Sequence, residues 1–516
     1  MTVSIRSRFA FTVGTNLVRA VFSFVTGMLL ARWLGPASYG NMAFLLGTFI
    51  GFRQLLDLGS SSAFFTFLSQ RPRSQRFVQS FYAWLAIQFI IPLCIIGMLF
   101  PVRWIQAIWH GEQRGLVLLA FAAAYMQYSV WPVVQQAGES QRKTVWVQGV
   151  GVMIVAVHLL AVVLLWRLGL LGLSALFAVL VLEYLLAAVV AHRGLQDAMT
   201  GEIDPTGETP GPVFKAFLRY CLPLIPYAGV SFAYEFADRW LLQKYGGGVQ
   251  QAYYAVGAQF AGIALIATTS ILRIFWKEIA EANHRGDHVR AGLLYKKVSR
   301  LLFLVGAVIA GFLIPWSEAL LHKFLGSAYV GGAMTLAIMF LYPVHQSMGQ
   351  IGTTMLMATE RVSHQVIIGI VFMILSMVVT YFVLAPRGST IPGLGLASEG
   401  LAIKMLVMQF VQVNVIAYII ARIWHWPFDW VYQPGSLLGC LGLGWLAHFG
   451  ATGLVGQTWN LFLVMGVGGL FYLVLMCGFV YAMPSLAGLT RAELVVDVRR
   501  AWSGLLRLCG HWRVQS

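Results

Sequence analysis

Charged residues are scarce in this chain: Asp, Glu, Lys and Arg make up 10% of 516 residues, whereas 59% are hydrophobic. Soluble domains carry about 25% charged residues, so this scarcity excludes a water-soluble protein. No GxxxxGK[ST] loop occurs, which excludes ATP hydrolysis at a P-loop of this chain. The five cysteines form no CxxC or Cys/His pair, so we expect neither a disulfide framework nor a metal site, and no cofactor.

Long apolar segments are abundant instead, and each is close to the roughly 20 residues that cross a bilayer. Because they are far longer than strands and show no alternation, we predict membrane-spanning helices. The predicted spans are 9–30, 41–69, 79–100, 115–137, 144–166, 168–191, 214–237, 249–272, 299–321, 331–357, 364–385, 393–420, 434–451 and 460–482. The sequence therefore predicts an all-α polytopic membrane protein with about 14 transmembrane helices.

Acidic residues are fewer than basic ones, 19 against 35, which gives a net charge of +16. Most Lys and Arg fall in loops and tails on the same side of the predicted spans as the N-terminus. This asymmetry places both termini in the cytoplasm, with the first helix retained, and the basic excess reads as attraction to lipid headgroups. We therefore expect membrane lipids, and no nucleic acid, as partners of the basic surface.

The order of landmarks along the chain indicates an internal duplication. A Gly- and Pro-rich stretch, 194–213, separates a predicted N-lobe (1–193, helices 1–6) from a C-lobe (214–429, helices 7–12). Glycine-rich turns precede helices two and eight, Gly-Leu pairs open helices six and twelve, and Ala-x-Glu recurs at 137–139 and 358–360. Such parallel repeats predict two lobes related by a pseudo-two-fold axis along the membrane normal. Two extra helices (430–483) and a basic amphipathic cytoplasmic tail (484–516) follow.

Several short motifs resemble a known family. They are Leu34-Gly35-Pro36-x-x-Tyr39-Gly40, Asp57-Leu58-Gly59, Asp238-Arg239 with Tyr254, and Ala358-Thr359-Glu360-Arg361. The chain resembles the polysaccharide transporters of the multidrug/oligosaccharidyl-lipid/polysaccharide exporter superfamily, in particular Wzx-type flippases of O-antigen or exopolysaccharide repeat units. The resemblance implies translocation of an undecaprenyl-pyrophosphate-linked oligosaccharide across the bacterial inner membrane by alternating access, for O-antigen, capsule or exopolysaccharide assembly. It also implies polysaccharide polymerase and chain-length proteins as partners.

Cations inside the predicted spans are the candidate substrate ligands. Counted at ~1.5 Å per residue, Arg19, Arg53 and Lys404 lie near mid-depth, and Arg273 lies at the end of helix eight. An intramembrane charge is costly, so it faces a cavity or a partner. Arginine binds pyrophosphate through bidentate hydrogen bonds. In lipid II flippases, similar in fold, cavity arginines lie on helices one, two and eight, which implies Arg19, Arg53 and Arg273 here.

A purely structural explanation stays open for each of these cations. Arg53 and Asp57 are spaced i, i+4 and would form an intrahelical pair, Arg19 has Asn16 nearby, and Lys404 has Glu399 five residues back.

The intramembrane acids are candidates for coupling to H⁺ or Na⁺, or for organising the cations. They are Asp57, Glu183, Glu235 and Asp238. Glu235 and Arg239 are spaced i, i+4, which favours a plain salt bridge there.

Pro223 and Pro226 lie inside predicted helix seven, where proline removes a backbone hydrogen bond and bends the axis, so we expect a hinge. In lipid II flippases the two extra helices border a groove for the polyprenyl tail, and stability or dimerisation would explain them equally well.

Three function classes follow, of which a flippase is the first. A multidrug cation antiporter of the same superfamily is the alternative, and the arginines count against it. A membrane-embedded enzyme needs a large extracytoplasmic loop with catalytic groups, and the predicted outer loops are short. His158 and His448 stand alone in the sequence, so we expect them to be packed or hydrogen-bonded and the protein not to be an enzyme.

Overall fold

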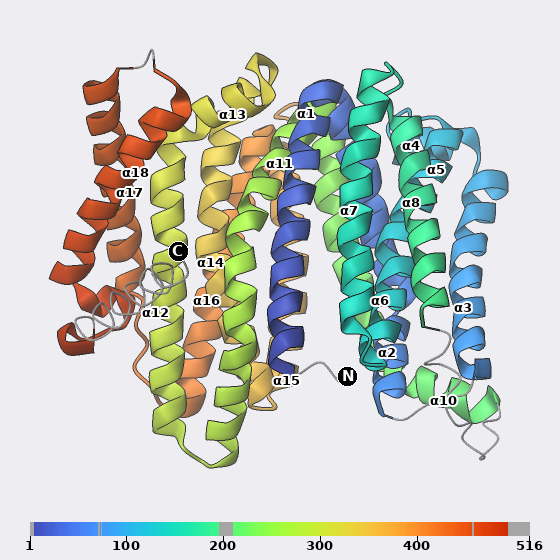
Figure 1. Ribbon diagram of the computed structural model, residues 1–516, viewed down its shortest axis with the longest axis horizontal. Coiled ribbons are helices and arrows are strands. Elements are labelled where there is room, and N and C mark those ends of the chain that lie inside the picture. The colour runs from blue at the N-terminus through green and yellow to red at the C-terminus, as the bar shows by residue number, and fades with distance from the viewer. Residues whose placement is uncertain (1–4, 71–72, 74, 196–209, 457–458, 494–516) are drawn as a thin grey trace, which may run out of the picture. The chain divides into compact units, whose positions relative to one another are not determined.

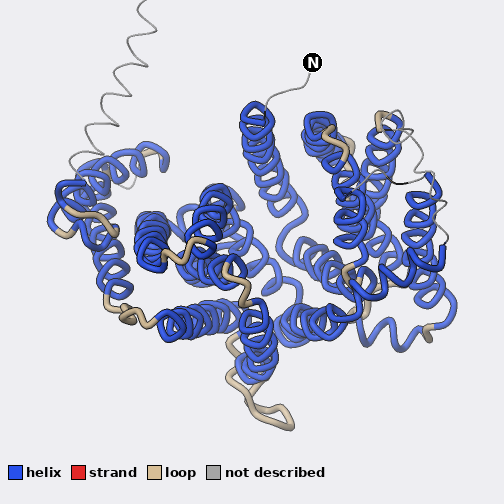
Figure 2. The backbone as a smooth tube through the Cα atoms, turned by 90° about the horizontal axis from the view of Figure 1, so that it is seen from below, coloured by secondary structure: helices blue, strands red, loops and turns tan. Residues whose placement is uncertain are grey.

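The computed structural model describes residues 5–70, 73, 75–195, 210–456 and 459–493. Within these ranges every regular element is a helix, as the tube in Figure 2 shows. The chain divides into two compact units. Unit 1 comprises residues up to 259, 324–332 and 369–404, and unit 2 comprises the remainder.

Unit 1 is built mainly from the first half of the chain. Its helices are α1 (Ile5–Asp57), α2 (Ser60–Gln70), α3 (Gln75–Cys94), α4 (Val102–Ile108), α5 (Arg114–Tyr125), α6 (Trp131–Ser140), α7 (Thr144–Arg167), α8 (Leu173–Arg193), α10 (Pro210–Cys221) and the first part of α11 (Ile225–His284). A π-helical turn, η2 (Met126–Val130), joins α5 to α6. Helix α1 packs against α7 and α5, and α8 packs against α7 and α5 (Figure 1).

Unit 2 contains the rest of α11 and the later helices. They are α12 (His288–Leu313), most of α13 (Ser317–Leu325), α14 (Ala333–Ala358), α17 (Tyr432–Val455) and α18 (Leu461–Ala482). Helix α12 packs against both α14 and α17. Helices α15 (Val362–Leu384) and α16 (Ala397–Trp424) each contribute to both units.

Twelve helical stretches among the described residues are long and apolar enough to span a membrane. Two of them, 14–57 and 213–263, each contain a kink at a glycine and account for two predicted spans, so every predicted span corresponds to a helical segment. The prediction of an all-α polytopic membrane protein is therefore confirmed.

The two kinks have the same backbone conformation. Gly35 has φ 74° and ψ 166°, and Gly247 has φ 70° and ψ −177°. Only glycine adopts this region without strain, because it has no Cβ atom. The two glycines precede predicted helices two and eight, so each half of the chain bends at the corresponding place.

Helices α1 and α11 run antiparallel and touch at small residues within unit 1. A Cβ atom on Gly40 would lie 1.7 Å from the Gly248 carbonyl oxygen, so the backbones nearly meet beside the kinks. On one side of this contact Gln243 donates to Asn41 over 2.9 Å. On the other side the Gln259 amide covers Gly27, where a Cβ atom would lie 2.0 Å from Nε2.

Three predicted spans are interrupted, and in the ninth the 3₁₀ turn η4 (Ile314–Trp316) separates α12 from α13. The second span breaks at Leu58 (φ 46°) and Gly59 (φ 83°), where α1 gives way to α2. The seventh span breaks at the 3₁₀ turn η3 (Leu222–Leu224), which separates α10 from α11. Helix α10 begins at Pro210, so the last residues of the predicted linker 194–213 are helical, and 196–209 lie outside the described residues. Figure 1 shows α10 crosswise to the long helices.

One repeat landmark is out of register. The backbone turn after α6 has Arg142 at φ 61°, and the turn after α14 has Glu360 at φ 60°. The following N–H groups, of Lys143 and Arg361, each donate 2.8 Å back to the carbonyl five residues earlier. The two turns are thus structurally equivalent. Superposing them places Glu360 at the position of Arg142, whereas the Ala-x-Glu sequence match places Glu360 at the position of Glu139.

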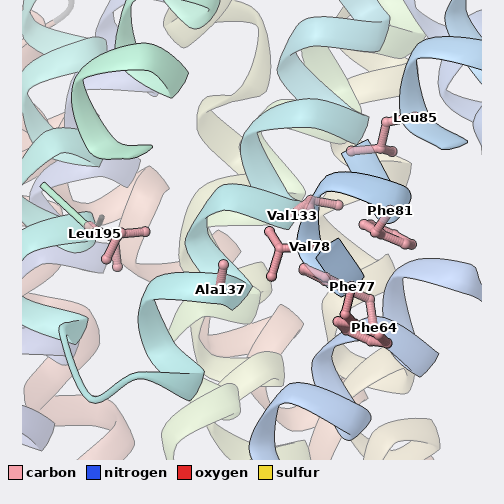
Figure 3. Packing of buried hydrophobic residues seen from close by; sticks show 9 residues of the cluster. Phe64, Phe77, Val78, Phe81, Leu85, Val133, Ala137 and Leu195 are labelled. Atoms are coloured by element: carbon pink, nitrogen blue, oxygen red, sulfur yellow. The ribbon is translucent and has the colours of Figure 1, made fainter. Parts of the chain in front are cut away.

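The core of unit 1 near α10 is aromatic. Phe64 of α2 stacks on Phe81 and Phe77 of α3, with ring centroids 4.0 and 5.8 Å apart, as Figure 3 shows. Phe217 of α10 packs on the same rings, 5.8 Å from Phe77. Phe214 on the same helix is 69% exposed. Helix α10 is therefore amphipathic, a pattern typical of helices at a membrane surface.

Candidate functional site

Arg53 and Glu235 lie on facing stretches of α1 and α11 in unit 1. Gln54 donates from Nε2 to Glu235 Oε1 over 2.8 Å, and Arg53 is an electrostatic neighbour of the same carboxylate. Among the residues that the structure describes, Arg53 forms no ion pair within 4.0 Å and no hydrogen bond, and it is half-buried. Its charge is thus only partly balanced by protein groups.

Arg239 is the second cation of this site. Its guanidinium lies over Gly47, where a Cβ atom would come 1.9 Å from Nη1. The predicted Glu235–Arg239 salt bridge is wrong: the two side chains interact only at longer range, and Glu235 hydrogen-bonds to Gln54 instead. Arg53, Arg239 and Glu235, here named the arginine site, therefore contain two cations and one anion.

Arg19 belongs to a neighbouring polar chain. Its Nη1 lies 3.5 Å from Gln148 Oε1 on α7, and Gln148 in turn donates to Glu139 of α6 over 3.0 Å. The local Asn16 partner considered from the sequence is replaced by this long-range contact. Arg19 also neighbours Tyr184 electrostatically, Tyr184 neighbours Tyr128, and Tyr128 neighbours Arg239. Arg19 and Arg239 thus each have one of two neighbouring tyrosines within electrostatic range.

Lys404 does not fit the predicted role in substrate binding. Its side chain is 0% exposed, and Nζ lies 2.8 and 2.7 Å from the two carboxylate oxygens of Asp238. Thr380 donates to the same carboxylate over 2.6 Å, and the Tyr234 ring lies 4.8 Å from the ammonium group. Because the pair is buried and its charges are balanced, we assign Lys404 and Asp238 a structural role.

Asp57 does not form the intrahelical pair with Arg53 that the spacing allowed. Its Oδ1 accepts hydrogen bonds from the Ser61 backbone N–H at 2.9 Å and from the Ser60 and Ser61 hydroxyls at 3.1 and 2.5 Å. These residues open α2, whose first N–H groups have no helical partner. Asp57 therefore caps α2 after the break at Leu58 and Gly59.

Glu183 of α8 pairs with His158 of α7. The distance from Oε2 to Nδ1 is 2.8 Å, and the two side chains are 8% and 17% exposed. The second carboxylate oxygen, Oε1, is buried without a hydrogen-bond partner. His158 is thus hydrogen-bonded, as expected, and Glu183 keeps an acceptor inside the helix bundle.

The remaining predicted site residues are placed as follows. Pro223 lies in η3 and Pro226 in the first turn of α11, so the prolines accompany a break in the helix, and hinge motion there stays a prediction. Arg273 lies in α11, but its side chain is outside the described residues. No group of three or more potential metal ligands occurs in the described part of the chain.

Sequence reasoning missed Arg239 as a candidate ligand because its spacing from Glu235 predicted a local salt bridge. Gly47 is the signal that could have identified Arg239, because a glycine within a helix often marks a place where a side chain of another helix comes close to the backbone. That signal becomes readable only once α1 and α11 are known to pack together.

Comparison with known families gives one match. Residues 6–276, just over half of the chain, match the family described as "Polysaccharide biosynthesis protein". The chain belongs to this family. No curated protein matched the sequence.

The fold of this polysaccharide biosynthesis protein is similar to that of solved multidrug transporters. An inward-facing MATE family transporter of the MOP superfamily has a TM-score of 0.59 at 14% identity, covering 78% of this chain and 95% of its own. A MATE protein in complex with MaD5 has a TM-score of 0.51 at 14% identity, covering 81% and 96%. The Vibrio cholerae transporter VcmN in the bent form has a TM-score of 0.50 at 10% identity, covering 81% and 96%. At these identities the likeness concerns the fold alone. Family and fold together describe a multi-pass membrane protein of the polysaccharide biosynthesis family whose fold is shared with solved transporters.

Proposed function

We propose that this protein is a flippase for an undecaprenyl-pyrophosphate-linked oligosaccharide. It would move the repeat unit across the bacterial inner membrane by alternating access, with both termini in the cytoplasm, for assembly of O-antigen, capsule or exopolysaccharide. The observation that carries the proposal is the excess of cations in the arginine site. Membership of the polysaccharide biosynthesis family supports a glycan as the cargo.

The chemistry of the arginine site suits a diphosphate. Arg53 and Arg239 are half-buried, are not ion-paired among the described residues, and share one carboxylate that already accepts a hydrogen bond. Guanidinium groups stay ionised when partly desolvated and bind phosphate oxygens through two parallel hydrogen bonds. Arg19 is a further cation in unit 1, and its guanidinium lies 3.5 Å from Gln148 Oε1, outside the arginine site.

Coupling to a proton or Na⁺ gradient belongs to the same proposal. Glu183 is the candidate among the predicted acids, because it is buried and one carboxylate oxygen has no hydrogen-bond partner. Asp57 and Asp238 are bound by other groups of the protein, and Glu235 belongs to the arginine site.

The experiment is complementation of a deletion strain, with the lipid-linked oligosaccharide pool measured by lipid extraction and mass spectrometry. We expect the deletion to accumulate one complete repeat unit and to lose surface polymer. Arg53→Gln and Arg239→Gln should each reduce export by about 10- to 100-fold, because each removes charged hydrogen bonds worth roughly 1.5–3 kcal/mol. Arg32→Gln, at an exposed position of the same helix α1, is the matched control.

Protein levels in the membrane fraction must be equal for the comparison. Normal export by both arginine variants at normal protein level would remove the arginine site from the proposal. An unchanged lipid-linked pool in the deletion strain, with altered sensitivity to cationic drugs, would move the function to the multidrug antiporter.

A further inference from the structure

Unit 1 contains a cavity away from the arginine site. Its volume is about 420 Å³, within the range of small-molecule pockets. Helices α3 and α8 form two of its walls, and α5, η2 and α6 form the third. Figure 3 shows Leu85, which belongs both to this wall and to the aromatic core around Phe64.

The walls of the cavity are apolar and firmly packed. Leu85 belongs to the aromatic core, whereas Val134 and Ala188 belong to a second buried cluster around Trp131. Tyr125 lines the cavity, but its hydroxyl donates to the Leu85 carbonyl oxygen over 2.7 Å. Because these residues are fixed by neighbours outside the cavity, the apolar space is preformed.

Polar groups gather at one end of the cavity. The Tyr82 hydroxyl oxygen lies 3.3 Å from His192 Nδ1, and Arg193 is the last residue of α8. Arg193 is exposed and, within the described part of the chain, makes no ion pair. Ala86 and Val189 on the rim are exposed as well, so the cavity opens to the outside of unit 1.

The surroundings of this end are typical of a membrane–water interface. Trp146 is 44% exposed, and its Nε1 donates to the Ala191 carbonyl oxygen over 3.4 Å. Tryptophan and basic residues concentrate at the level of lipid headgroups. The predicted orientation puts the C-terminal end of α8 on the cytoplasmic side, where the leaflet is anionic.

We propose that this cavity binds one acyl chain of an anionic phospholipid, with the lipid phosphate at Arg193. The chain would enter between Ala86 and Val189 and end near Phe89 and Tyr125. Between Tyr82 and Phe89, α3 rises about 10 Å, which accommodates part of one acyl chain. Among the described residues that line the cavity, Arg193 is the only lysine or arginine, and its single charge matches a phosphodiester, whereas a diphosphate would call for more positive charge. The nearby Lys143 ammonium group donates to the Gly194 carbonyl oxygen over 2.7 Å. The site is separate from the transported substrate and does not depend on its identity.

The test is photolabelling of the full-length protein in nanodiscs that contain phosphatidylglycerol with a diazirine in one acyl chain. Peptide mass spectrometry should place label on 82–89 and 188–193. Val189→Trp should fill the opening and abolish this label, whereas Val190→Trp, an exposed neighbour that does not line the cavity, should leave it unchanged.

The headgroup contact is tested with Arg193→Gln and with Arg167→Gln as a control at the opposite end of a neighbouring helix. Loss of one interfacial arginine should lower the preference for phosphatidylglycerol over phosphatidylcholine about fivefold. The Arg167 variant should keep the preference.

Three results would overturn the proposal. Label spread evenly over lipid-facing helices, and unaffected by Val189→Trp, would indicate general lipid contact only. Displacement of the label by a polyprenyl diphosphate but not by unlabelled phosphatidylglycerol would assign the cavity to an isoprenoid chain. Equal labelling by anionic and zwitterionic lipid in the unaltered protein would remove Arg193 from the site.

Discussion

Removing one partner of the Lys404–Asp238 pair should destabilise the protein strongly. The ammonium group contacts both carboxylate oxygens, and the lysine side chain is wholly buried. Lys404→Met leaves the carboxylate buried with the Thr380 hydroxyl as its one remaining hydrogen-bond partner among the described residues. Breaking a buried pair in this way costs about 3–5 kcal/mol, which corresponds to roughly two to three and a half powers of ten in the unfolding equilibrium.

The assay is thermal unfolding of the purified full-length protein in one detergent, with identical heating rates because membrane proteins of this size often unfold irreversibly. We expect a large drop in the unfolding temperature for Lys404→Met and for Asp238→Leu. Lys323→Met, which removes an exposed lysine, should leave the unfolding temperature unchanged.

The double variant Lys404→Met/Asp238→Leu separates a structural role from a role in binding. Since it leaves no charge uncompensated, it should recover most of the lost stability. It should also recover export in the complementation assay. A double variant that is stable but inactive would return Lys404 to the substrate ligands. A single variant as stable as the unaltered protein would refute the energetic reasoning.

Three further predictions concern single positions. Gly47→Ala should displace the guanidinium lying over it and lower export at normal stability, whereas Gly14→Ala, which has open space around it, should be neutral in the export assay. Asp57→Ala should lower the free energy of unfolding by about 1–2 kcal/mol, because it removes the acceptor that caps α2. Asp57→Asn retains an acceptor and should keep most of the stability. It should also keep export, whereas a coupling role would require the negative charge. Burial lowers the pKa of His110, so the unfolded state binds the proton first, and stability should fall as the pH drops below about 6.5. In unfolding scans from pH 7.5 to 5.5, His110→Phe should reduce this loss of stability, and His288→Phe, at an exposed position, should not. Identical pH profiles for the unaltered protein and both variants would contradict the assignment of the pH dependence to His110.

The membrane fold could be predicted from the sequence because apolar segments of span length have one structural solution in lipid. Breaks inside the segments were harder to predict. Leu58 and Gly59 interrupt the second predicted span without proline, and both have positive φ, while Asp57 caps the helix that follows them. The prolines at 223 and 226 did indicate the break before α11, because they weaken the helix locally.

The site was harder to predict, because sequence spacing reports only neighbours on the same helix. Both local pairs suggested by i, i+4 spacing, Arg53 with Asp57 and Glu235 with Arg239, are replaced by contacts to other residues. Depth along a helix indicated that Lys404 faces either a cavity or a partner, and its partner comes from α11, which is far away in sequence. Depth alone did not decide between the two, because the choice depends on the packing of α11 and α16.

The antiparallel contact of α1 and α11 has a consequence for how charge came to be distributed in unit 1. The interval along the chain from Gly27 to Arg239 equals the interval between the kinked glycines Gly35 and Gly247. The interval from Gly47 to Gln259 is the same. In both contacts a long side chain covers a glycine, Gln259 over Gly27 and Arg239 over Gly47. A gene duplication would thus have supplied two equivalent contacts, in which Gly27 corresponds to Arg239 and Gly47 corresponds to Gln259. Of the two long side chains in these contacts, only Arg239 is charged, so the pair of contacts carries its positive charge at Gly47 and not at Gly27. Exchanging the arginine and the glutamine would move that charge to the other contact and leave both glycines in place.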